Sequence, residues 1–531
     1  MKAKEAILQG KTALGIEFGS TRIKAVLTDL NSEVLAVGTY DWENKLLNGV
    51  WTYSLEEIHT GLAECYRSMK RAVEKEWDVT ITRIGAMGIS AMMHGYMPFN
   101  HERELLTPFR TWRNRYTQQA ADVLTKRFGF NIPLRWTIAH LYQSILDQGE
   151  HVPEISYVTT LDAYLHWILS GQKVTGIGDA SGMFPVDSDT CDYCADMIQS
   201  FDELIEPYGF SWKIKDILPG ILRAGEPAGT LTEAGAAMID PEGDLLPGVP
   251  MCPPEGDAGT GMVATDSVAP LTGNVSAGTS TFAMVTLEKQ LSKVYRGIDM
   301  VTTPSGYPVA MAHASNGTSD LNAWVGLFGE FAKLAGCAMD PGDLYRLLYT
   351  HSLTGESDCG GLLAYGYLSG EGVAGLEEGR PLFVRTPDAG MNLANFFRCH
   401  LYTALGAVRL GMNILQKEEQ ISIGRIMAHG GLFKTRGVGQ RYLSAALGVP
   451  VTVMSTASEG GAWGMAVLAL YMIDGAAGGA TLEDYLRGKI FSGKRGETIT
   501  ASAEEIEGYD AFVKRYQEGL DIEREAVNCL I

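Results

Sequence analysis

The sequence has no surplus of positive charge. It carries 43 Lys and Arg residues against 63 Asp and Glu residues, which gives a formal net charge of −20. No run of Lys or Arg supplies the basic face that a general nucleic-acid binder needs, so we expect no nucleic acid among the partners. Any anionic ligand has to be held by local groups, because the field of the whole chain repels it.

Cysteines are few and scattered. There are eight in 531 residues, and the only close pair is Cys191 and Cys194. No second Cys or His pair follows at a spacing that would complete a zinc site. Dispersed thiols of this kind are typical of a reducing cytosol rather than of a secreted disulfide scaffold.

Long apolar runs are also absent. No uncharged apolar run reaches the roughly 20 residues that a membrane-spanning helix needs. The first eleven residues are polar and mixed, and they lack the apolar segment of a signal peptide. We therefore expect a cytoplasmic protein that has no contact with a membrane.

The chain is long enough for more than one domain. At a common domain size of about 100–200 residues, 531 residues predict two or more domains. Helical and strand patterns alternate: residues 55–76 and 461–472 have helical character, residues 84–90 read as a buried strand, and residues 436–447 read as a helix followed by a strand at 449–454. This alternation predicts an α/β architecture.

Two segments share one local pattern. Residues 13–29 and residues 273–286 each contain an apolar strand, a tight turn rich in Gly, Ser and Thr, and a second apolar strand. After the first hairpin, residues 34–40 read as a third strand of a meander. The repeat of one hairpin in each half predicts two related domains, with a boundary at residues 262–270 that we place between 264 and 265, giving domains 1–264 and 265–531.

The turns of these hairpins can bind an anion. Gly19, Ser20 and Thr21 form the first turn, with Lys24 on the next strand, and Gly278, Thr279 and Ser280 form the second. Successive backbone N–H groups in such a turn make an anion-binding concavity. Either turn alone is more often a purely structural hairpin turn, but two copies in matching strand contexts favour a function.

An aspartate lies among glycines. Asp257 sits within residues 254–261, Pro-Glu-Gly-Asp-Ala-Gly-Thr-Gly, where the small neighbours leave room for a ligand beside its carboxylate. The alternative is a helix N-cap, a position that Asp favours. A second Gly-rich segment, residues 429–434, follows the apolar residues 421–428 and lets a planar group approach the backbone at Gly430 and Gly431, with Lys434 close behind.

Two further segments carry polar groups suited to a sugar. Met93 and His94 end a buried strand, and the carboxyl ends of strands are where α/β folds bind ligands. Trp112 and Asn114 combine an aromatic face with an amide, next to arginines, and such sets stack on sugars and bond to their hydroxyls. A buried structural histidine and a solvated loop are the plainer interpretations.

Taken in order along the chain, these motifs resemble the FGGY family of carbohydrate kinases, within the actin, hexokinase and heat-shock ATPase superfamily. The motifs that carry the resemblance are residues 17–24, 88–95, 112–116, 178–181, 256–257, 278–280, 367–371 and 430–440. The resemblance runs from about residue 12 to about residue 475. It implies two ribonuclease-H-like, actin-like ATPase domains that flank a central cleft.

The resemblance also implies a reaction and roles for these residues. ATP and Mg²⁺ would be the cofactors, and Asp257 the catalytic base that orients a sugar hydroxyl. Glu17 and Asp257 would lie next to the metal. Sugar contacts would come from Met93, His94, Trp112, Asn114 and Asp257, and ATP contacts from Gly19, Ser20, Thr21, Lys24, Gly278, Thr279, Ser280, Gly430, Gly431 and Lys434.

Three positions depart from the family pattern. Glu17 stands where relatives have Asp, Met92 stands where they have Gln, and Asn114 stands where they have Asp. The segment Met93-His94-Gly95 looks most like that of ketopentose kinases, xylulokinases and some ribulokinases, so D-xylulose or L-ribulose is the expected sugar. Other family substrates, namely a ketohexose, a deoxyketose or a polyol, stay open.

Two rival functions also stay open. A chaperone or filament ATPase of the same superfamily would share both phosphate turns but would need no sugar site. A regulatory pseudokinase would sense sugar without turnover, and the departures at Glu17, Met92 and Asn114 keep this alternative open. We expect a small-molecule sugar as partner, and a homodimer is an open possibility for the oligomeric state.

Overall fold

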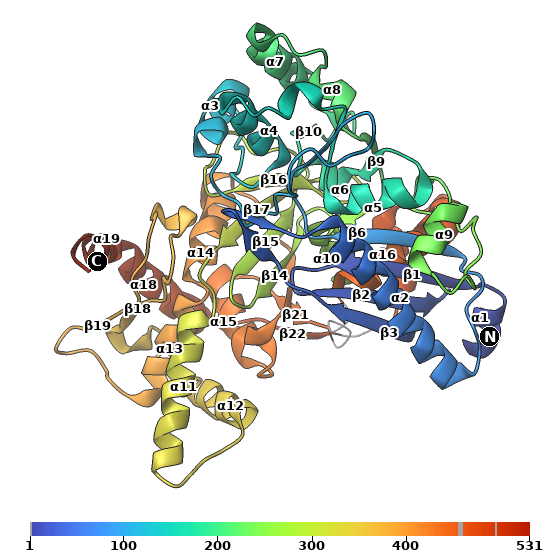
Figure 1. Ribbon diagram of the computed structural model, residues 1–531. Coiled ribbons are helices and arrows are strands. Elements are labelled where there is room, and N and C mark those ends of the chain that lie inside the picture. Colours follow the sequence, from blue (N-terminus) through green and yellow to red (C-terminus); the bar gives the residue numbers. More distant parts are fainter. Residues whose placement is uncertain (1–2, 455–459, 494–495, 531) are drawn as a thin grey trace. The chain divides into compact units, whose positions relative to one another are not determined.

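The chain folds into two compact units (Figure 1). The computed structural model describes residues 3–454, 460–493 and 496–530. The first unit consists of Met1–Ala269, Met300–Val309 and Ser458–Lys494, and the second of Pro270–Asp299, Ala310–Ala457 and Arg495–Ile531. The boundary that we place between 264 and 265 lies close to the first division point, but the two later returns of the chain to the first unit were not predicted.

The core of the first unit is a five-stranded sheet in the order β13-β6-β1-β2-β3. The predicted hairpin and meander are confirmed, because β1, β2 and β3 pair antiparallel in sequence, while β6 and β13 continue the sheet in parallel with β1. The strands span Thr12–Phe18 (β1), Arg22–Asp29 (β2), Val34–Asp41 (β3), Ala86–Ala91 (β6) and Glu255–Gly256 (β13).

A seven-stranded sheet, in the order β16-β17-β15-β14-β20-β21-β22, repeats this arrangement, and its strands β14, β15, β20, β21 and β22 lie in the second unit. Its hairpin, β14 with β15, is antiparallel, and β14 pairs in parallel with β20, which pairs in parallel with β21. This confirms the predicted repeat and the α/β, ribonuclease-H-like class of both domains. The strands span Thr272–Ala277 (β14), Thr281–Thr286 (β15), Asp299–Thr302 (β16), Pro308–Ala314 (β17), Arg425–His429 (β20), Val451–Val453 (β21) and Glu497–Ile499 (β22).

Helices cover the first sheet. The helix α2 (Leu55–Trp77) starts with a capping box between Ser54 and Glu57 and packs on β2 and β3. The helix α16 (Gly460–Leu470) packs on β1 and β6. Gly15 permits this close contact, because a Cβ atom there would lie 2.0 Å from the Ala462 carbonyl oxygen. The sheet and α16 therefore approach each other backbone to backbone.

The predicted helices are present. Residues 55–76 correspond to α2, residues 461–472 to α16, and residues 436–447 to α15 (Val438–Leu447), which ends at Gly448 in a left-handed conformation. Within the residues that the structure describes, no helix combines the length and the apolar character that a membrane crossing requires.

A buried lysine ties α2 to a neighbouring loop. The Lys70 side chain is 1% exposed, and its ammonium group donates to Asp240 at 3.1 Å, Glu242 at 2.8 Å and Asp244 at 2.6 Å. These acids follow α9 (Glu233–Ile239). Burial alone would lower the pKa of Lys70, but the three carboxylates outweigh it and raise that pKa. The ammonium group is therefore charged at neutral pH and holds α2 against the loop.

Candidate active site

Asp257 lies at the carboxyl edge of the first sheet. It is the first residue of α10 (Asp257–Ala264), directly after β13, and the cap position belongs to Gly256 rather than to Asp257. The Met93 backbone N–H donates to Asp257 Oδ1 at 3.0 Å. The protein around the carboxyl raises its pKa above the ordinary value, although hydrogen bonds from the backbone of Met93 and Ala258 oppose that rise. The side chain is accessible to solvent, so it can meet a ligand.

Glu17 is the second carboxylate at this edge. It lies near the end of β1, where it pairs with Lys24 of β2 and Ser90 of β6. The Ala462 N–H at the start of α16 donates to Glu17 Oε2 at 3.2 Å. Burial, and next the charge of Asp257, raise the pKa of Glu17 to about 7, against the lowering effects of the Ala462 N–H and Lys24. The negative charge of Asp257 therefore acts on the Glu17 carboxyl and makes its ionisation less favourable.

Aromatic side chains hold the turn at residues 19–21. The Gly19 N–H donates to the Arg22 carbonyl at 3.0 Å and closes the turn. The Trp42 indole N–H donates to the Gly19 carbonyl at 2.7 Å, and the Tyr53 hydroxyl donates to the Ser20 carbonyl at 2.5 Å. Trp42 and Tyr53 also stack on each other, with ring centroids 3.9 Å apart. The carbonyls of the turn are thereby anchored on its inner side.

The predicted sugar residues Trp112 and His94 also lie in the first unit. The Trp112 indole N–H donates to Ser20 Oγ at 3.3 Å, and the ring is partly exposed beside the turn. His94 is buried and has a left-handed backbone, with φ 72°. Its Nδ1 lies 3.2 Å from the Gly182 carbonyl oxygen. Because a carbonyl only accepts, Nδ1 carries the proton in this contact.

Asn114 does not face open space. The side chain is 2% exposed, and its Oδ1 accepts from the Trp51 N–H at 2.9 Å. Its Nδ2 donates to the Trp51 carbonyl at 2.8 Å and to the Thr111 carbonyl at 3.0 Å. Both ends of the amide are therefore used to fix β5 (Val50–Thr52). This arrangement favours a positioning role over the direct sugar contact that the sequence predicted.

The Asn114 bonds lead to a stability prediction. Replacing Asn114 with Asp, the residue of the family pattern, removes both N–H donors and directs a carboxyl oxygen at two carbonyls. A buried group left without its partner costs about 1–3 kcal/mol, so we expect Asn114→Asp to lower the free energy of unfolding by that amount in urea titrations. Asn322 is the control, because it is exposed and only its oxygen is used, accepting from the Tyr345 hydroxyl. Equal stability of the Asn114→Asp and Asn322→Asp proteins would contradict the prediction.

Three buried carboxyl groups lie behind Asp257. Glu255, Asp179 and Asp162 are each at most 2% exposed. Thr160 and Thr175 donate to Asp179 Oδ2 at 2.6 and 3.2 Å. Burial raises the pKa of all three, that of Glu255 to about 8. Glu255 therefore keeps a proton at neutral pH, which limits the negative charge packed behind the β13–α10 turn. Sequence reasoning missed this cluster, although it quoted Asp179 as part of a motif.

The second unit presents its own turn at the matching place. Gly278, Thr279 and Ser280 link β14 to β15. At the same end of the sheet, His429 pairs with Ser276 and is followed by Gly430, whose φ is 105°. The Gly431–Phe433 turn and the exposed Lys434 come next. The predicted ATP residues of this unit thus lie at one edge of its sheet.

A polar segment missed by the sequence reasoning supports the second turn. The Gly317 N–H donates to the Thr279 carbonyl at 2.7 Å, and the Thr318 N–H donates to the Gly278 carbonyl at 2.8 Å. Next to them, the Asn316 Nδ2 donates to the fully buried carboxylate of Glu371 at 3.1 Å. Glu371 ends the motif at residues 367–371, so that motif acts by fixing residue 316 beside the turn. Residues 317–319 repeat the Gly-Thr-Ser pattern of residues 278–280, and this repeat was the sequence signal that could have identified the segment.

Gly317 gives a prediction for nucleotide binding. A Cβ atom there would lie 2.4 Å from the Gly278 carbonyl oxygen and 2.9 Å from the Thr279 carbonyl oxygen. We therefore expect Gly317→Ala to displace the turn and to weaken ATP binding by at least about tenfold, equivalent to about 1.4 kcal/mol. Calorimetric titration with ATP measures this. Gly326→Ala, where nothing lies within 4 Å of the new atom, should bind normally, and unchanged affinity of Gly317→Ala would refute the role of the turn.

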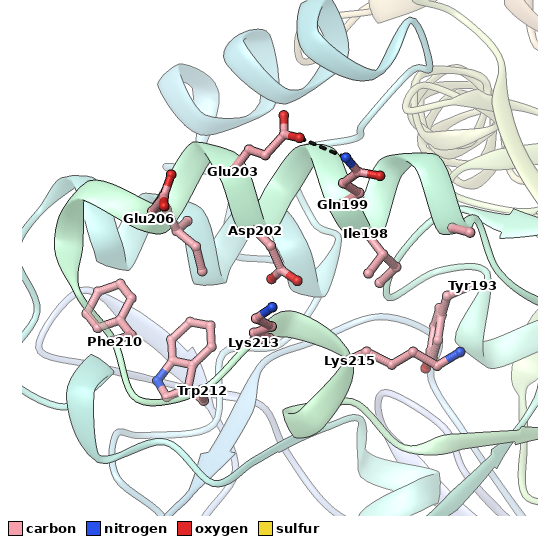
Figure 2. A pocket seen from close by; sticks show the side chains of 12 residues that line it. Tyr193, Ile198, Gln199, Asp202, Glu203, Glu206, Phe210, Trp212, Lys213 and Lys215 are labelled. Carbon is pink, nitrogen blue, oxygen red and sulfur yellow. Dashed lines mark hydrogen bonds between the residues drawn. The ribbon is translucent and has the colours of Figure 1, made fainter.

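A separate pocket opens elsewhere in the first unit (Figure 2). It has a volume of about 590 Å³ and lies along α7 (Ala195–Ile205) and α8 (Ile214–Ile217). None of the predicted site residues lines it. Asp202 already accepts from the Ile214 N–H at 2.9 Å, and Lys215 donates to Asp192 at 2.5 Å. Several of its polar groups are thus already partnered within the protein.

Comparisons with known proteins agree with this geometry. Residues 12–263 match the N-terminal domain, and residues 273–473 the C-terminal domain, of the FGGY family of carbohydrate kinases. Glycerol kinase of Thermococcus gammatolerans is 25% identical over 44% of this chain and 47% of its own length. Xylulose kinase of Escherichia coli is 23% identical over 53% of this chain and 55% of its own length. The chain thus spans about half the length of the curated relatives it matches.

The fold of the whole chain has solved counterparts. The crystal structure of a xyloylose kinase from Brucella ovis superposes with a TM-score of 0.78 and 19% identity, and the match covers 97% of this chain and 100% of that one. The two matched domains together account for most of the sequence. The chain belongs to the FGGY family of carbohydrate kinases.

Proposed function

We propose that this protein transfers the γ-phosphoryl group of ATP to a terminal hydroxyl of a sugar. The sugar is a ketopentose, D-xylulose or L-ribulose, and the product is the ketose 5-phosphate. The observation that carries the proposal is the position of Asp257, a solvent-accessible carboxylate held by the Met93 N–H at the sheet edge where the first phosphate turn also lies.

The proposed chemistry uses Asp257 chiefly to orient the nucleophile. Its carboxylate accepts a hydrogen bond from the attacking hydroxyl and takes the proton late, because even a raised Asp pKa lies far below that of an alcohol. Phosphoryl transfer needs little covalent help and much charge stabilisation. The backbone N–H groups of residues 19–21 and 278–280 are suited to neutralise the phosphate oxygens. Gly430, Gly431 and Lys434 are assigned to the adenosine.

The carboxylates Glu17 and Asp257 fit a magnesium ion. Mg²⁺ is usually bound through one or two carboxylates together with substrate phosphates and water. The charge of Asp257 helps to raise the pKa of Glu17 to about 7, so the pair carries unbalanced negative charge that a cation would relieve. When bound, held by Glu17 and Asp257, the ion would supply positive charge that offsets the charge developing on the transferred phosphoryl group. The longer Glu side chain at position 17 is compatible with a contact through water.

This assignment predicts how magnesium binding depends on pH. A carboxyl must be ionised to bind a metal, and Glu17 is ionised above about pH 7 and protonated below it. We expect the Mg²⁺ concentration that half-saturates ATP turnover to rise as the pH falls through 7. A Glu17→Gln protein should lose that dependence. The same pH dependence in wild type and in Glu17→Gln would remove Glu17 from the metal site.

The experiment that tests the function is a substrate panel. Purified protein is given ATP, Mg²⁺ and a series of ketoses, aldoses and polyols, and ADP release is followed with coupling enzymes. The proposal expects release that depends on D-xylulose or L-ribulose. Release with a ketohexose, deoxyketose or polyol alone would reassign the sugar. Release without any sugar would indicate a chaperone or filament ATPase instead.

A sugar-sensing pseudokinase is the remaining alternative. It would show stabilisation by sugar in thermal melts without ADP release. Two of the three departures from the family pattern have structural roles in this fold. Met92 is buried and donates its N–H to the Phe18 carbonyl at 3.0 Å, and the Asn114 amide bonds to the backbone. These contacts support turnover over the pseudokinase.

A further inference from the structure

Arg110 of the first unit lies against two tyrosine rings. Its backbone pairs with that of Tyr96 in an antiparallel bridge, so the two side chains project from the same face. The guanidinium carbon lies 5.0 Å from the centroid of the Tyr96 ring and 5.8 Å from that of the Tyr116 ring. Aromatic faces attract a cation at such distances. Both rings therefore help to hold the guanidinium group in place.

Most of the hydrogen-bonding capacity of this guanidinium group is unused. A guanidinium has five N–H donors. Within residues 3–454, 460–493 and 496–530, the Arg110 side chain makes one hydrogen bond, from Nη1 to Ser144 Oγ at 2.7 Å, and no ion pair with a carboxylate. Its Nε–H is buried and has no acceptor there. Buried charges in proteins are normally paired, so the described part of the chain leaves this one without a counter-ion.

Two more deeply buried arginines are matched by stronger acceptors. Arg398 donates to two backbone carbonyls, both at 3.1 Å. Arg409 donates to a backbone carbonyl and, at 2.6 Å, to the Asp510 carboxylate. Each of them uses two of its nitrogen atoms in this way, whereas Arg110 uses one, on a hydroxyl. The fold therefore neutralises its other buried arginines better than it neutralises Arg110.

Two histidines complete what we call the Arg110 cluster. The His140 ring, on α4 (Thr137–Leu146), lies parallel to the Tyr96 ring with centroids 6.3 Å apart. His151 Nε2 lies 3.0 Å from the Tyr96 hydroxyl. The members of the cluster are thus Tyr96, Arg110, Tyr116, His140 and His151.

The guanidinium group carries the only charge of this cluster. Burial, and next the charge of Arg110, lower the pKa of His140 to about 3 and that of His151 to about 4. Burial raises the pKa of both tyrosines. All four side chains are therefore neutral near pH 7. The nearby acid Asp147 accepts from the Gln143 amide at 3.0 Å instead of pairing with the guanidinium group.

Solvent reaches the cluster beside Tyr116. The Tyr116 side chain is 46% exposed and Arg110 is partly exposed, so a small ligand can approach the guanidinium group. Its planar fork of N–H groups matches two oxygens of a carboxylate or a phosphate. We propose that the Arg110 cluster is an oxyanion site, which binds the phosphate or carboxylate group of a small metabolite. The cluster contains no residue assigned to ATP, to the sugar or to Mg²⁺, so this proposal does not depend on the proposed function.

The first test follows the Arg110 Nε–H resonance in protein labelled with nitrogen-15 at arginine. The resonance is assigned by its loss in Arg110→Lys or, if that variant does not fold, by its displacement in Tyr116→Ala. Inorganic phosphate at millimolar concentrations should shift it to saturation, and chloride at equal ionic strength should not. The Arg409 Nε–H, which is also buried, is the control and should stay in place. An Arg110 resonance that phosphate does not move, or that moves together with that of Arg409, overturns the proposal.

The second test measures affinity through the same resonance. Tyr116→Ala should weaken phosphate binding by about two- to fivefold, because a cation–π contact no longer holds the guanidinium group in its binding position. Tyr208→Ala is the control, since Tyr208 is 45% exposed in the same unit and lies outside the cluster. Equal affinities of wild type and Tyr116→Ala would contradict a site built on these rings. A parallel titration with acetate distinguishes the two sources, because the anion that binds more tightly identifies the ligand group as phosphate or carboxylate.

Discussion

Replacing Asp257 with Asn should lower kcat by roughly 10²–10⁴-fold, the usual contribution of a positioned acid or base, and leave ATP binding nearly unchanged. Asn has the same shape, and its Oδ1 can still accept the Met93 N–H bond, so the local fold is kept. The amide, however, accepts a proton far less readily than a carboxylate. Single-turnover phosphoryl transfer and ATP titration measure the two quantities separately.

The matched control for this variant is Asp189→Asn. Asp189 lies exposed in a loop of the same unit, so the loss of its charge should leave kcat within error of wild type. If Asp257→Asn retained most of the turnover, another group would have to orient the hydroxyl. If it lost ATP binding together with turnover, the carboxylate would be part of the nucleotide site instead.

Replacing Lys70 with Met should destabilise the first unit by about 3 kcal/mol or more, the lower end for breaking a buried ion pair. Without the ammonium group, Asp240 remains buried and is left with the backbone N–H groups of Asp244 and Leu245 as donors, at 3.1 and 2.9 Å. Those donors limit the loss of stability at Asp240. Glu242 and Asp244 add less to it, because their side chains are half exposed and water can solvate their charges.

Differential scanning calorimetry of the Lys70→Met protein should show the transition of the first unit lowered by several degrees. Lys215→Met is the control, because Lys215 forms a 2.5 Å pair with Asp192 that is about half exposed on both sides, and such pairs contribute at most about 1 kcal/mol. Coincident transitions for both variants would mean that the buried pair adds nothing to stability.

The turns of the site could be predicted because their signals are local. The alternation of apolar residues around Gly19 and around Gly278 specifies a hairpin from a few neighbouring residues, and both hairpins are present. The sequence singled out Asp257 by its small neighbours, but the strand before it was not predicted, because β13 has only two residues and leaves no local pattern. The partial desolvation of the Asp257 carboxylate by the surrounding protein, which raises the pKa of Asp257, depends on the whole fold.

Features that depend on distant residues could not be predicted. Asn114 reads as a sugar ligand in the sequence, but the Trp51 backbone, 63 residues earlier, bonds to both ends of its amide. Likewise, Glu371 is bonded to Asn316 across 55 residues. No pattern within either segment reveals its partner, because the contact exists only once the sheet and its loops are assembled.

The packing of α16 on β1 and β6 sets an order for folding during synthesis. These strands are complete early, but the helix that covers them lies about 380 residues further along. At about 5–20 residues per second on the ribosome, translation from residue 91 to residue 470 takes roughly 20–75 s. For that time the nascent first sheet lacks the cover of α16, so a chaperone that shields apolar strands should bind the growing chain in this interval and leave once α16 emerges.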